Sequence, residues 1–291
     1  MTHRKNIAVV GATGAVGTVF LEMLEERKFP VGDLRLCASE RSLGKRITVN
    51  GDQIEVELLS SELVEKVDMV FVSASSDISH LAASMIGDTN TILIDDSSAF
   101  RMDPDVPLIV PEVNSEALKD VKNIISIPNC STTPLVMALK PLHDNFSIKR
   151  VIVDTYQSVS GTGSAALDEL KTQTKQYLDN DSIQADVYPH QIAFNVLPHI
   201  EPFLPNGYTR EEMKMLNETR KILNIPDLNL SATCARVPVM IGHSEAVHAE
   251  FHNPIDLEKS VELLRGFPGI RVVDDPISVS YTHLTQPTNR E

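Results

Sequence analysis

The sequence predicts an α/β fold in two domains, and three observations support that prediction. The chain has 291 residues, a length typical of one large or two medium domains. Before residue 129, apolar strand-like runs alternate with helical patterns, which is typical of a parallel sheet with crossover helices. Beyond residue 130 the strand candidates become longer, and one alternates like a half-exposed antiparallel strand. We therefore expect a parallel-sheet domain over residues 1–129 and an α+β domain with a mainly antiparallel sheet over 130–277.

Five apolar runs are the expected strands of the first domain. They cover residues 6–10, 34–38, 68–74, 91–96 and 123–128. Between the second and third runs, Asn50 and Gly51 separate two alternating stretches. This dipeptide favours the tight turn of a local β-hairpin.

The second domain is expected to contain three strands and three helices. The strands are 149–161, 229–240 and 243–252, and the helices are 164–179, 210–223 and 256–265. Thr209, followed three residues later by Glu212, forms the capping-box pattern at the start of the second helix. Residues 278–291 show neither helical nor strand periodicity, so we expect a tail there that does not match the domain.

Composition and charge disfavour several classes of function. The formal charge of −14 opposes non-specific binding to nucleic acid or to an anionic membrane. The N-terminus leads from a short polar start into a strand, without the hydrophobic segment of a signal peptide, so we expect a cytoplasmic protein. Cys37, Cys130 and Cys234 are odd in number and far apart, which indicates neither a disulfide framework nor a metal site.

A glycine-rich loop follows the first expected strand. In "VVGATGAVG", Gly11 permits a tight turn, Gly14 lets the backbone approach a pyrophosphate, and Gly17 lets the next helix pack on the strand. The N-terminus of that helix then faces the anion. The order of strand, loop and helix predicts a Rossmann-type dinucleotide site, although a glycine turn without a ligand gives the same spacing.

The end of the second expected strand bears on which dinucleotide is bound. An acidic residue there usually accepts hydrogen bonds from the ribose 2′-hydroxyl. Here Ser39 occupies that place, and it is followed by Glu40, Arg41, Ser42 and Lys45. Two positive charges and the hydroxyl groups suit a 2′-phosphate, which favours NADP. Glu40 keeps NAD open, and a solvated basic loop without a ligand is the other alternative.

Cys130 lies between an expected strand and a helical run that begins "STTP". Ser131 is a natural N-cap residue, and Pro134 suits a first helical turn. A thiol at that position experiences the positive end of the helix dipole, which lowers its pKa and stabilises the thiolate. The alternative is a buried, unreactive cysteine, which we expect for Cys37 and Cys234 within strands.

Charged residues elsewhere in the sequence could serve such a thiolate. His243 begins a strand after a glycine turn and could reach a cleft as the base, although a lone histidine of this kind is more often structural. Arg101, and Arg236 within an apolar strand, each indicate an anionic partner such as a ligand carboxylate or phosphate. One face of the 210–223 helix carries three charged residues that alone indicate only an exposed ion-pair stripe: Lys214, Glu218 and Lys221.

Seven motifs occur in one collinear order between residues 5 and 275. They are "IAVVGATGAVG", "ASERSLGK", "DDSSAFRMDPDVPLIVPEVN", "IPNCSTTPLVMALKPL", "TYQSVSGTG", "NETRKIL" and "CARVPVMIGHSEAV". Together they resemble the aspartate-β-semialdehyde dehydrogenase family. The resemblance implies an NADP-dependent oxidoreductase that reduces aspartyl phosphate to aspartate semialdehyde through a cysteine thioester. It places the chain in the biosynthesis of lysine (through diaminopimelate), threonine and methionine, as a homodimer with small-molecule substrates and no nucleic-acid, membrane or metal partner.

The resemblance also implies roles for individual residues. Cys130 corresponds to the nucleophile, His243 to the acid/base, and Gln157 to the residue that orients the substrate next to the sulfur. Arg236 corresponds to the residue that binds the substrate carboxylate, and Glu218 to the one near its amino group. The implied phosphate-binding residues are Arg101, Lys221, Asn129 and Lys214. The cofactor contacts expected from the glycine loop, the segment after the second strand and the resemblance together are Gly11, Thr13, Gly14, Ala15, Val16, Ser39, Arg41, Ser42, Ser160 and Gly161.

Two alternatives remain at this point. An N-acetyl-γ-glutamyl-phosphate reductase shares the fold and the thioester chemistry, but "NETRKIL" and "RVPVMIGHSEAV" favour the aspartate enzyme. Members of the family continue past residue 275 with a strand and a long helix, where this sequence has the segment 278–291. A non-catalytic NADP-binding protein is therefore the second alternative.

Overall fold

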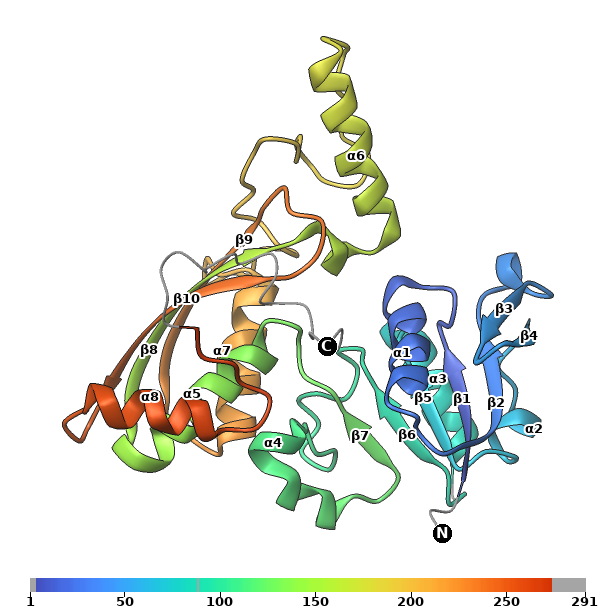
Figure 1. The fold of residues 1–291 in the computed structure, drawn as a ribbon, viewed down its shortest axis with the longest axis horizontal. Coiled ribbons are helices and arrows are strands. Elements are labelled where there is room, and N and C mark those ends of the chain that lie inside the picture. Colours follow the sequence, from blue (N-terminus) through green and yellow to red (C-terminus); the bar gives the residue numbers. More distant parts are fainter. Residues whose placement is uncertain (1–3, 88, 274–291) are drawn as a thin grey trace. The chain divides into compact units, whose positions relative to one another are not determined.

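The computed structural model describes residues 4–87 and 89–273, so the predicted tail at 278–291 lies outside the described residues. The chain divides into two compact units (Figure 1). The first comprises Met1–Ile109 and Ser115–Pro128, and the second comprises Val110–Asn114 and Asn129–Glu291.

The first unit is built on a seven-stranded sheet with the order β3-β4-β2-β1-β5-β6-β7. Its strands are β1 (Lys5–Val10), β2 (Val31–Cys37), β3 (Arg46–Val49), β4 (Asp52–Glu57), β5 (Met69–Val72), β6 (Ile92–Asp95) and β7 (Ile124–Ser126). All neighbouring pairs run parallel except β3 and β4, which form the predicted hairpin. Asn50 and Gly51 at its tip both have positive φ, as a tight hairpin turn requires.

The strand order places the glycine loop at a topological switch point. Val10, the last residue of β1, pairs with Cys37 of β2 on one side and with Val72 of β5 on the other. Parallel sheets bind ligands beyond the carboxyl ends of their strands at such points. The sequence alone therefore located the loop correctly at the end of β1.

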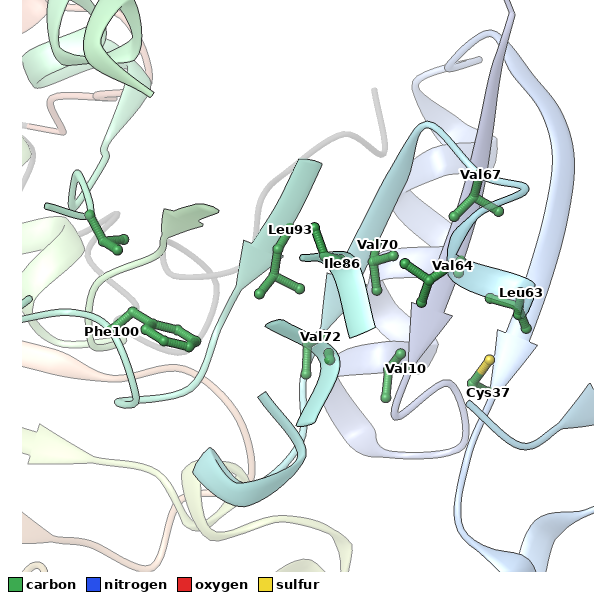
Figure 2. Close-up of a cluster of buried hydrophobic side chains, with 13 residues drawn as sticks. Val10, Cys37, Leu63, Val64, Val67, Val70, Val72, Ile86, Leu93 and Phe100 are labelled. Atoms are coloured by element: carbon green, nitrogen blue, oxygen red, sulfur yellow. The ribbon is translucent and has the colours of Figure 1, made fainter. Parts of the chain in front are cut away.

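The helices of the first unit pack on this sheet around two apolar clusters. Its helices are α1 (Ala15–Glu26), α2 (Ser61–Val64) and α3 (Ser76–Ile86), with 3-10 turns η1 (Glu40–Ser42) and η2 (Ser115–Asp120). Figure 2 shows one cluster, in which Val10, Val70, Val72 and Leu93 of the sheet are buried together. Cys37 belongs to the same cluster, and burial raises the pKa of its thiol to about 12.

The second unit contains a three-stranded sheet with the order β10-β8-β9. The strands are β8 (Ile148–Gln157), β9 (Asn229–Arg236) and β10 (Ser244–Phe251). β10 pairs antiparallel with β8, whereas β8 and β9 run parallel, so the sheet is mixed rather than mainly antiparallel. The reason is the long connection between β8 and β9, which contains two helices and leaves enough chain for a crossover.

The helices of this unit are α4 (Pro111–Asn114), α5 (Thr132–Phe146), α6 (Ser164–Leu178), α7 (Arg210–Leu223) and α8 (Leu257–Gly266), with the 3-10 turn η3 (Val159–Thr162). The predicted spans 164–179, 210–223 and 256–265 correspond to α6, α7 and α8 and agree with them to within about one residue at each end. The predicted capping box of α7 is present, because Thr209 and Glu212 each hydrogen-bond the other's backbone. α7 packs against both β9 and α5, which brings its buried face to the N-terminus of α5.

Candidate active site

Cys130 stands immediately before α5, with Ser131 as the N-cap of that helix. Its side chain is exposed, whereas Cys37 and Cys234 are buried. Burial also raises the pKa of the Cys234 thiol to about 12, so this cysteine remains protonated at neutral pH. The exposed thiol at the helix mouth is thus the one suited to act as a thiolate.

The imidazole of His243 lies beside this thiol. His243 directly precedes β10, and its Nε2 is 3.2 Å from the Cys130 Sγ. The Ser158 backbone N–H donates to the His243 Nδ1 at 3.0 Å, and the Ser158 hydroxyl lies 3.1 Å from the same nitrogen. Because a backbone N–H can only donate, Nδ1 is the acceptor, and the neutral ring carries its proton on Nε2, facing the sulfur.

The charge state of His243 follows from its surroundings. Burial above all, and then the positive charge of Arg236, lower the pKa of His243 to about 4, against an opposing effect of Glu211. The ring is therefore neutral at physiological pH. A neutral Nε2–H is a hydrogen-bond donor to a thiolate or to an oxygen attached to the same carbon.

Arg236 and Gln157 end two neighbouring strands in register. Gln157 of β8 pairs with Arg236 of β9, and both side chains are buried. The Arg236 Nη1 donates to the Ser158 carbonyl oxygen at 2.7 Å and to the Gln157 Oε1 at 3.5 Å. Gly161 lies against this group, because a Cβ there would stand 3.0 Å from the Arg236 Nη1 and 3.4 Å from the His243 ring.

Two buried carboxylates of α7 hold the residue before the cysteine. The Glu218 Oε2 accepts the Asn129 backbone N–H at 2.6 Å. The Glu211 Oε1 accepts the Asn129 Nδ2 at 2.9 Å and the Gln157 Nε2 at 3.1 Å. Glu211 and Glu218 are 3% and 1% exposed, so they act inside the unit rather than on its surface.

The predicted phosphate-binding residues fall into different places. Asn129 belongs to the buried group just described, and Lys221 lies on α7 one turn after Glu218. Lys214 forms ion pairs with Glu201 and, at 3.4 Å, with Glu211, so two carboxylates already neutralise its charge. Arg101 belongs to the first unit, where its Nη2 donates to the Asp96 carbonyl oxygen at 2.9 Å.

The glycine loop has the shape of a phosphate cradle. Gly11 has a φ of +88°, and a Cβ there would lie 2.1 Å from the Ser73 carbonyl oxygen. A Cβ on Gly17 would lie 2.2 Å from the Gly11 carbonyl oxygen, so only glycine lets α1 pack this closely. Gly14 is the N-cap of α1, and Ala15 and Val16 begin its first turn. A dinucleotide pyrophosphate fits this place, because the free N–H groups of a helix N-terminus bind anions.

The segment after β2 contacts the same glycine loop. The Thr13 Oγ1 lies 3.4 Å from the buried Ser42 hydroxyl, and the Lys45 Nζ donates to that hydroxyl at 3.5 Å. Ser39 is the N-cap of η1, and Arg41 within that turn is exposed. The remaining predicted cofactor contacts lie in the second unit: Ser160 and Gly161, in η3.

Comparisons with known proteins decide the family. Residues 6–121 match the model described as "Semialdehyde dehydrogenase, NAD binding domain", and residues 139–290 match "Semialdehyde dehydrogenase, dimerisation domain". The aspartate-semialdehyde dehydrogenase of Aquifex aeolicus is 50% identical over 279 residues, which cover 94% of this chain and 82% of that protein. The chain belongs to the aspartate-semialdehyde dehydrogenase family.

Solved structures of aspartate-semialdehyde dehydrogenases share the fold. The Vibrio cholerae enzyme II complexed with ASA matches with a TM-score of 0.90 and 45% identity, covering 93% of this chain and 81% of that one. The Candida albicans enzyme with NADP matches with a TM-score of 0.68 and 27% identity, covering 91% and 77%. The predicted α/β fold and enzyme class are thereby confirmed, and the dimerisation-domain match supports the predicted homodimer.

Two residues of this polar site were not predicted from the sequence. Glu211 lies seven residues before Glu218, two helical turns along the same face, and that spacing was a usable signal. Ser158 gave no signal, because its contribution to His243 is a backbone N–H. Within residues 4–87 and 89–273, no helix is long and apolar enough to cross a membrane, and no group of His, Cys, Asp or Glu could hold a metal ion.

Proposed function

We propose that the chain interconverts L-aspartate 4-semialdehyde and L-4-aspartyl phosphate with NADP, through a thioester on Cys130. The observation that carries this proposal is the Cys130–His243 pair, 3.2 Å apart at a helix N-terminus, beside a buried arginine. Such a pair suits covalent catalysis, in which one difficult step becomes two accessible ones. The names of the relatives support the substrate, and the NADP in the Candida albicans structure supports the cofactor.

The chemistry assigned to the chain's own residues is as follows. The Cys130 thiolate attacks the aldehyde carbon, and the resulting thiohemiacetal loses hydride and becomes a thioester. Phosphate then attacks the thioester carbon, which releases aspartyl phosphate and regenerates the thiolate. His243 is the acid/base for the oxygen on the reacting carbon, and Gln157 orients the substrate next to the sulfur. When bound, NADP would accept this hydride in the oxidative direction and return it in the reductive direction.

The anionic and cationic groups of the substrate need separate partners. Arg236 suits the α-carboxylate, because its guanidinium is buried next to the Cys130–His243 pair. Glu218 is assigned to the α-amino group, and Asn129, Lys221 and Arg101 are assigned to the phosphate. Lys214, which pairs with Glu201 and Glu211, is assigned to the same phosphate-binding set.

The domains divide the work in this proposal. Residues 1–129 bind the dinucleotide and residues 130–277 carry the catalytic and dimer-forming surfaces. The cell uses the reductive direction, in a cytoplasmic route to lysine, threonine and methionine. The loop residues bind the pyrophosphate, and η1 binds the adenosine ribose with its 2′-phosphate.

The deciding measurement is NADP reduction with aspartate semialdehyde, in the presence and absence of phosphate. We expect phosphate-dependent turnover, and Cys130→Ala should reduce kcat by about 10³-fold or more, because the nucleophile is gone. Cys37→Ala is the control, since its thiol lies buried in the first unit. A second protein carries the C-terminal segment of the Aquifex aeolicus relative in place of residues 278–291, so that the result does not depend on the predicted tail. Absence of turnover in both proteins, or full activity of Cys130→Ala, contradicts the proposal.

The choice of NADP over NAD depends on Arg41. Arg41→Ala should weaken NADP binding about tenfold and leave NAD binding nearly unchanged, because only the 2′-phosphate needs the guanidinium. Glu40→Gln is the matched control in the same turn. Dissociation constants for both nucleotides, measured by calorimetry, give the answer. Equal losses of NADP and NAD affinity would show that Arg41 does not contact a 2′-phosphate.

A further inference from the structure

The nitrogen of the His243 ring that faces away from Cys130 has two partners on one serine. The Ser158 backbone N–H donates to the His243 Nδ1 at 3.0 Å, and the Ser158 Oγ lies 3.1 Å from the same nitrogen. The Ser158 Oγ also lies 2.9 Å from the Ser160 Oγ. Two hydroxyl groups therefore form a chain that ends on Nδ1, and none of the roles assigned so far includes this chain.

The backbone holds this chain of hydroxyl groups in place. Ser158 is the N-cap of η3 and is fully buried. A serine at the N-cap of a helix usually bonds the first turn of that helix, whereas the Ser158 hydroxyl faces the imidazole and the Ser160 hydroxyl. The Ser160 backbone N–H donates to the Met240 carbonyl oxygen at 3.2 Å, three residues before His243. The serines and the ring are thus fixed relative to one another.

The neutral His243 ring cannot exchange a proton at one nitrogen alone. Its Nε2 carries the proton, because Nδ1 accepts the Ser158 backbone N–H. If Nε2 gives that proton to an oxygen, the ring becomes an anion unless Nδ1 gains a proton at the same time. A cationic ring is also disfavoured: burial, and then the charge of Arg236, lower the pKa of His243 to about 4, against an opposing effect of Glu211. Acid/base chemistry at Nε2 therefore needs a proton partner at Nδ1.

We propose that the Ser158 and Ser160 hydroxyls form a proton relay to the His243 Nδ1, so that the ring gives a proton at Nε2 and receives one at Nδ1 while it stays neutral. A hydroxyl suits this task because it donates and accepts at once. The Ser158 backbone N–H can only donate, so it favours the resting tautomer, and the relay reaches the other tautomer transiently. Both serines act through His243. The proposal rests on the proposed function in that it assigns the acid/base role to His243.

The protons and electrons balance in each direction. When the Cys130 thiolate adds to the aldehyde carbon, the C–S bond forms and the π electron pair of C=O moves to the oxygen. That oxygen takes the Nε2 proton, and Nδ1 takes the Ser158 hydroxyl proton. Ser158 then takes a proton from Ser160, and Ser160 takes one from water. When hydride leaves the same carbon, C=O forms again and every proton transfer reverses, so no net proton is gained or lost.

Ser158→Ala tests the relay, because it removes the hydroxyl and keeps the backbone N–H that selects the resting tautomer. General acid–base catalysis contributes about 10²- to 10⁴-fold, and the Nε2–H remains as a hydrogen-bond donor, so we expect kcat to fall about 10-fold to 100-fold with KM little changed. Ser231→Ala in β9 is the matched control, since its hydroxyl lies 3.4 Å from the Tyr208 hydroxyl. Its kcat should stay within about twofold of the original. A kcat of Ser158→Ala in that same range overturns the proposal.

A second measurement follows the relay without turnover. In the protein without substrate or cofactor, the relay delivers protons from water to Nδ1, which speeds the exchange of the Nε2 proton with solvent. NMR of protein labelled with ¹⁵N-histidine measures this exchange, and the spectrum of His243→Gln identifies the signal. We expect Ser158→Ala to slow the exchange about fivefold or more, as for the loss of one hydrogen-bonded link, and Ser231→Ala to leave it unchanged.

The two measurements separate the relay from a structural role and from the proposed function. An unchanged exchange rate in Ser158→Ala overturns the relay even if kcat falls, because Ser158 then only supports the site. A protein without semialdehyde activity that still shows the slower exchange contradicts only the proposed function. If Ser158→Ala fails to fold, Ser160→Ala breaks the same chain one link further from the ring. Exchange at the original rate in that variant, measured without cofactor, overturns the proposal.

Discussion

The glycine loop of the first unit and the polar group around Cys130 in the second unit are built in different ways. The loop occupies residues 11–17, and its shape depends on backbone atoms and on the absence of Cβ atoms. The polar group draws side chains from the segment 129–130, the end of β8, the first three turns of α7, the end of β9 and the residue before β10. The glycine loop is formed by one short stretch of sequence. The polar group around Cys130 forms only when the whole second unit folds.

The difference teaches what damages each site. A site made of closely approaching backbone fails when a side chain is added, because there is no space for it. A site made of buried hydrogen bonds fails when a donor or acceptor is replaced, even at constant volume. An added side chain should therefore be more damaging in the glycine loop, whereas the loss of a hydrogen-bond donor or acceptor should be more damaging in the polar group.

After Cys130 itself, the largest effect is expected at His243. His243→Ala removes a donor that lies 3.2 Å from the Cys130 sulfur, and should lower kcat about 10²- to 10³-fold, as does loss of one preorganised donor. His243→Gln can place an N–H near the same position and should retain more activity than the alanine variant. Steady-state kinetics of both variants give the measurement, and equal kcat values would show that the hydrogen-bond donor is not what His243 contributes.

The same residue predicts a dependence of stability on pH. The pKa of His243 is lowered from 6.5 to about 4 in the fold, mainly by burial. Between these two values the unfolded chain binds more protons at this position than the folded one. The contribution of His243 is therefore fully present above pH 6.5 and is lost as the pH falls towards 4. Chemical denaturation of the original protein and of His243→Gln across this range should show a smaller acid loss in the variant; identical curves would refute the shift.

The next effect tests the other site. Gly17→Ala places a Cβ 2.2 Å from the Gly11 carbonyl oxygen, which the backbone can relieve only by moving α1. Overpacking of this kind costs about 3 kcal/mol in the free energy of unfolding, and NADP affinity should fall with it. Gly14→Ala is the matched control for stability, because its Cβ would meet the same oxygen at 3.2 Å and its φ of −80° is ordinary. If both variants have the same free energy of unfolding, the close approach of α1 is not what fixes the loop.

The two sites also differ in how far the sequence predicted them. The loop could be predicted because Gly11, Gly14 and Gly17 lie within one turn and the start of one helix. Cys130 could be predicted because it directly precedes Ser131, the N-cap residue of its helix. Glu211 could not be assigned a role, since its partners Asn129 and Gln157 lie 82 and 54 residues away and meet it only after α7 packs on β9 and α5.

The error in the fold has a related cause. Alternation along residues 243–252 predicted an antiparallel strand correctly, because β10 pairs antiparallel with β8. The direction of β9 relative to β8 depends on how the chain between them crosses over, and no local pattern records that. Periodicity therefore predicts that a strand exists. Which strands pair with it, and in which direction, depends on the fold of the whole unit.

The smallest effect concerns a buried carboxylate that lies outside the polar group. Glu245 of β10 pairs with Thr155 of β8, and among the described residues its Oε1 has no hydrogen-bond partner. Burial raises the pKa of Glu245 from 4.5 to about 8, so the folded chain binds more protons than the unfolded one between these values. The stability it confers is full below pH 4.5 and is lost as the pH rises through 8.

Glu245→Gln should therefore stabilise the protein at alkaline pH. We expect about 1 kcal/mol in the free energy of unfolding at pH 8 and no gain near pH 4.5, since glutamine imitates the protonated carboxyl at every pH. Glu250→Gln on the same strand is the control, because that carboxylate is exposed and pairs with Lys149 and Arg150. Urea denaturation at several pH values measures both. If Glu245→Gln destabilises the protein at pH 8, the Glu245 carboxylate is charged and has a hydrogen-bonding or ionic partner, as the Glu211 carboxylate does.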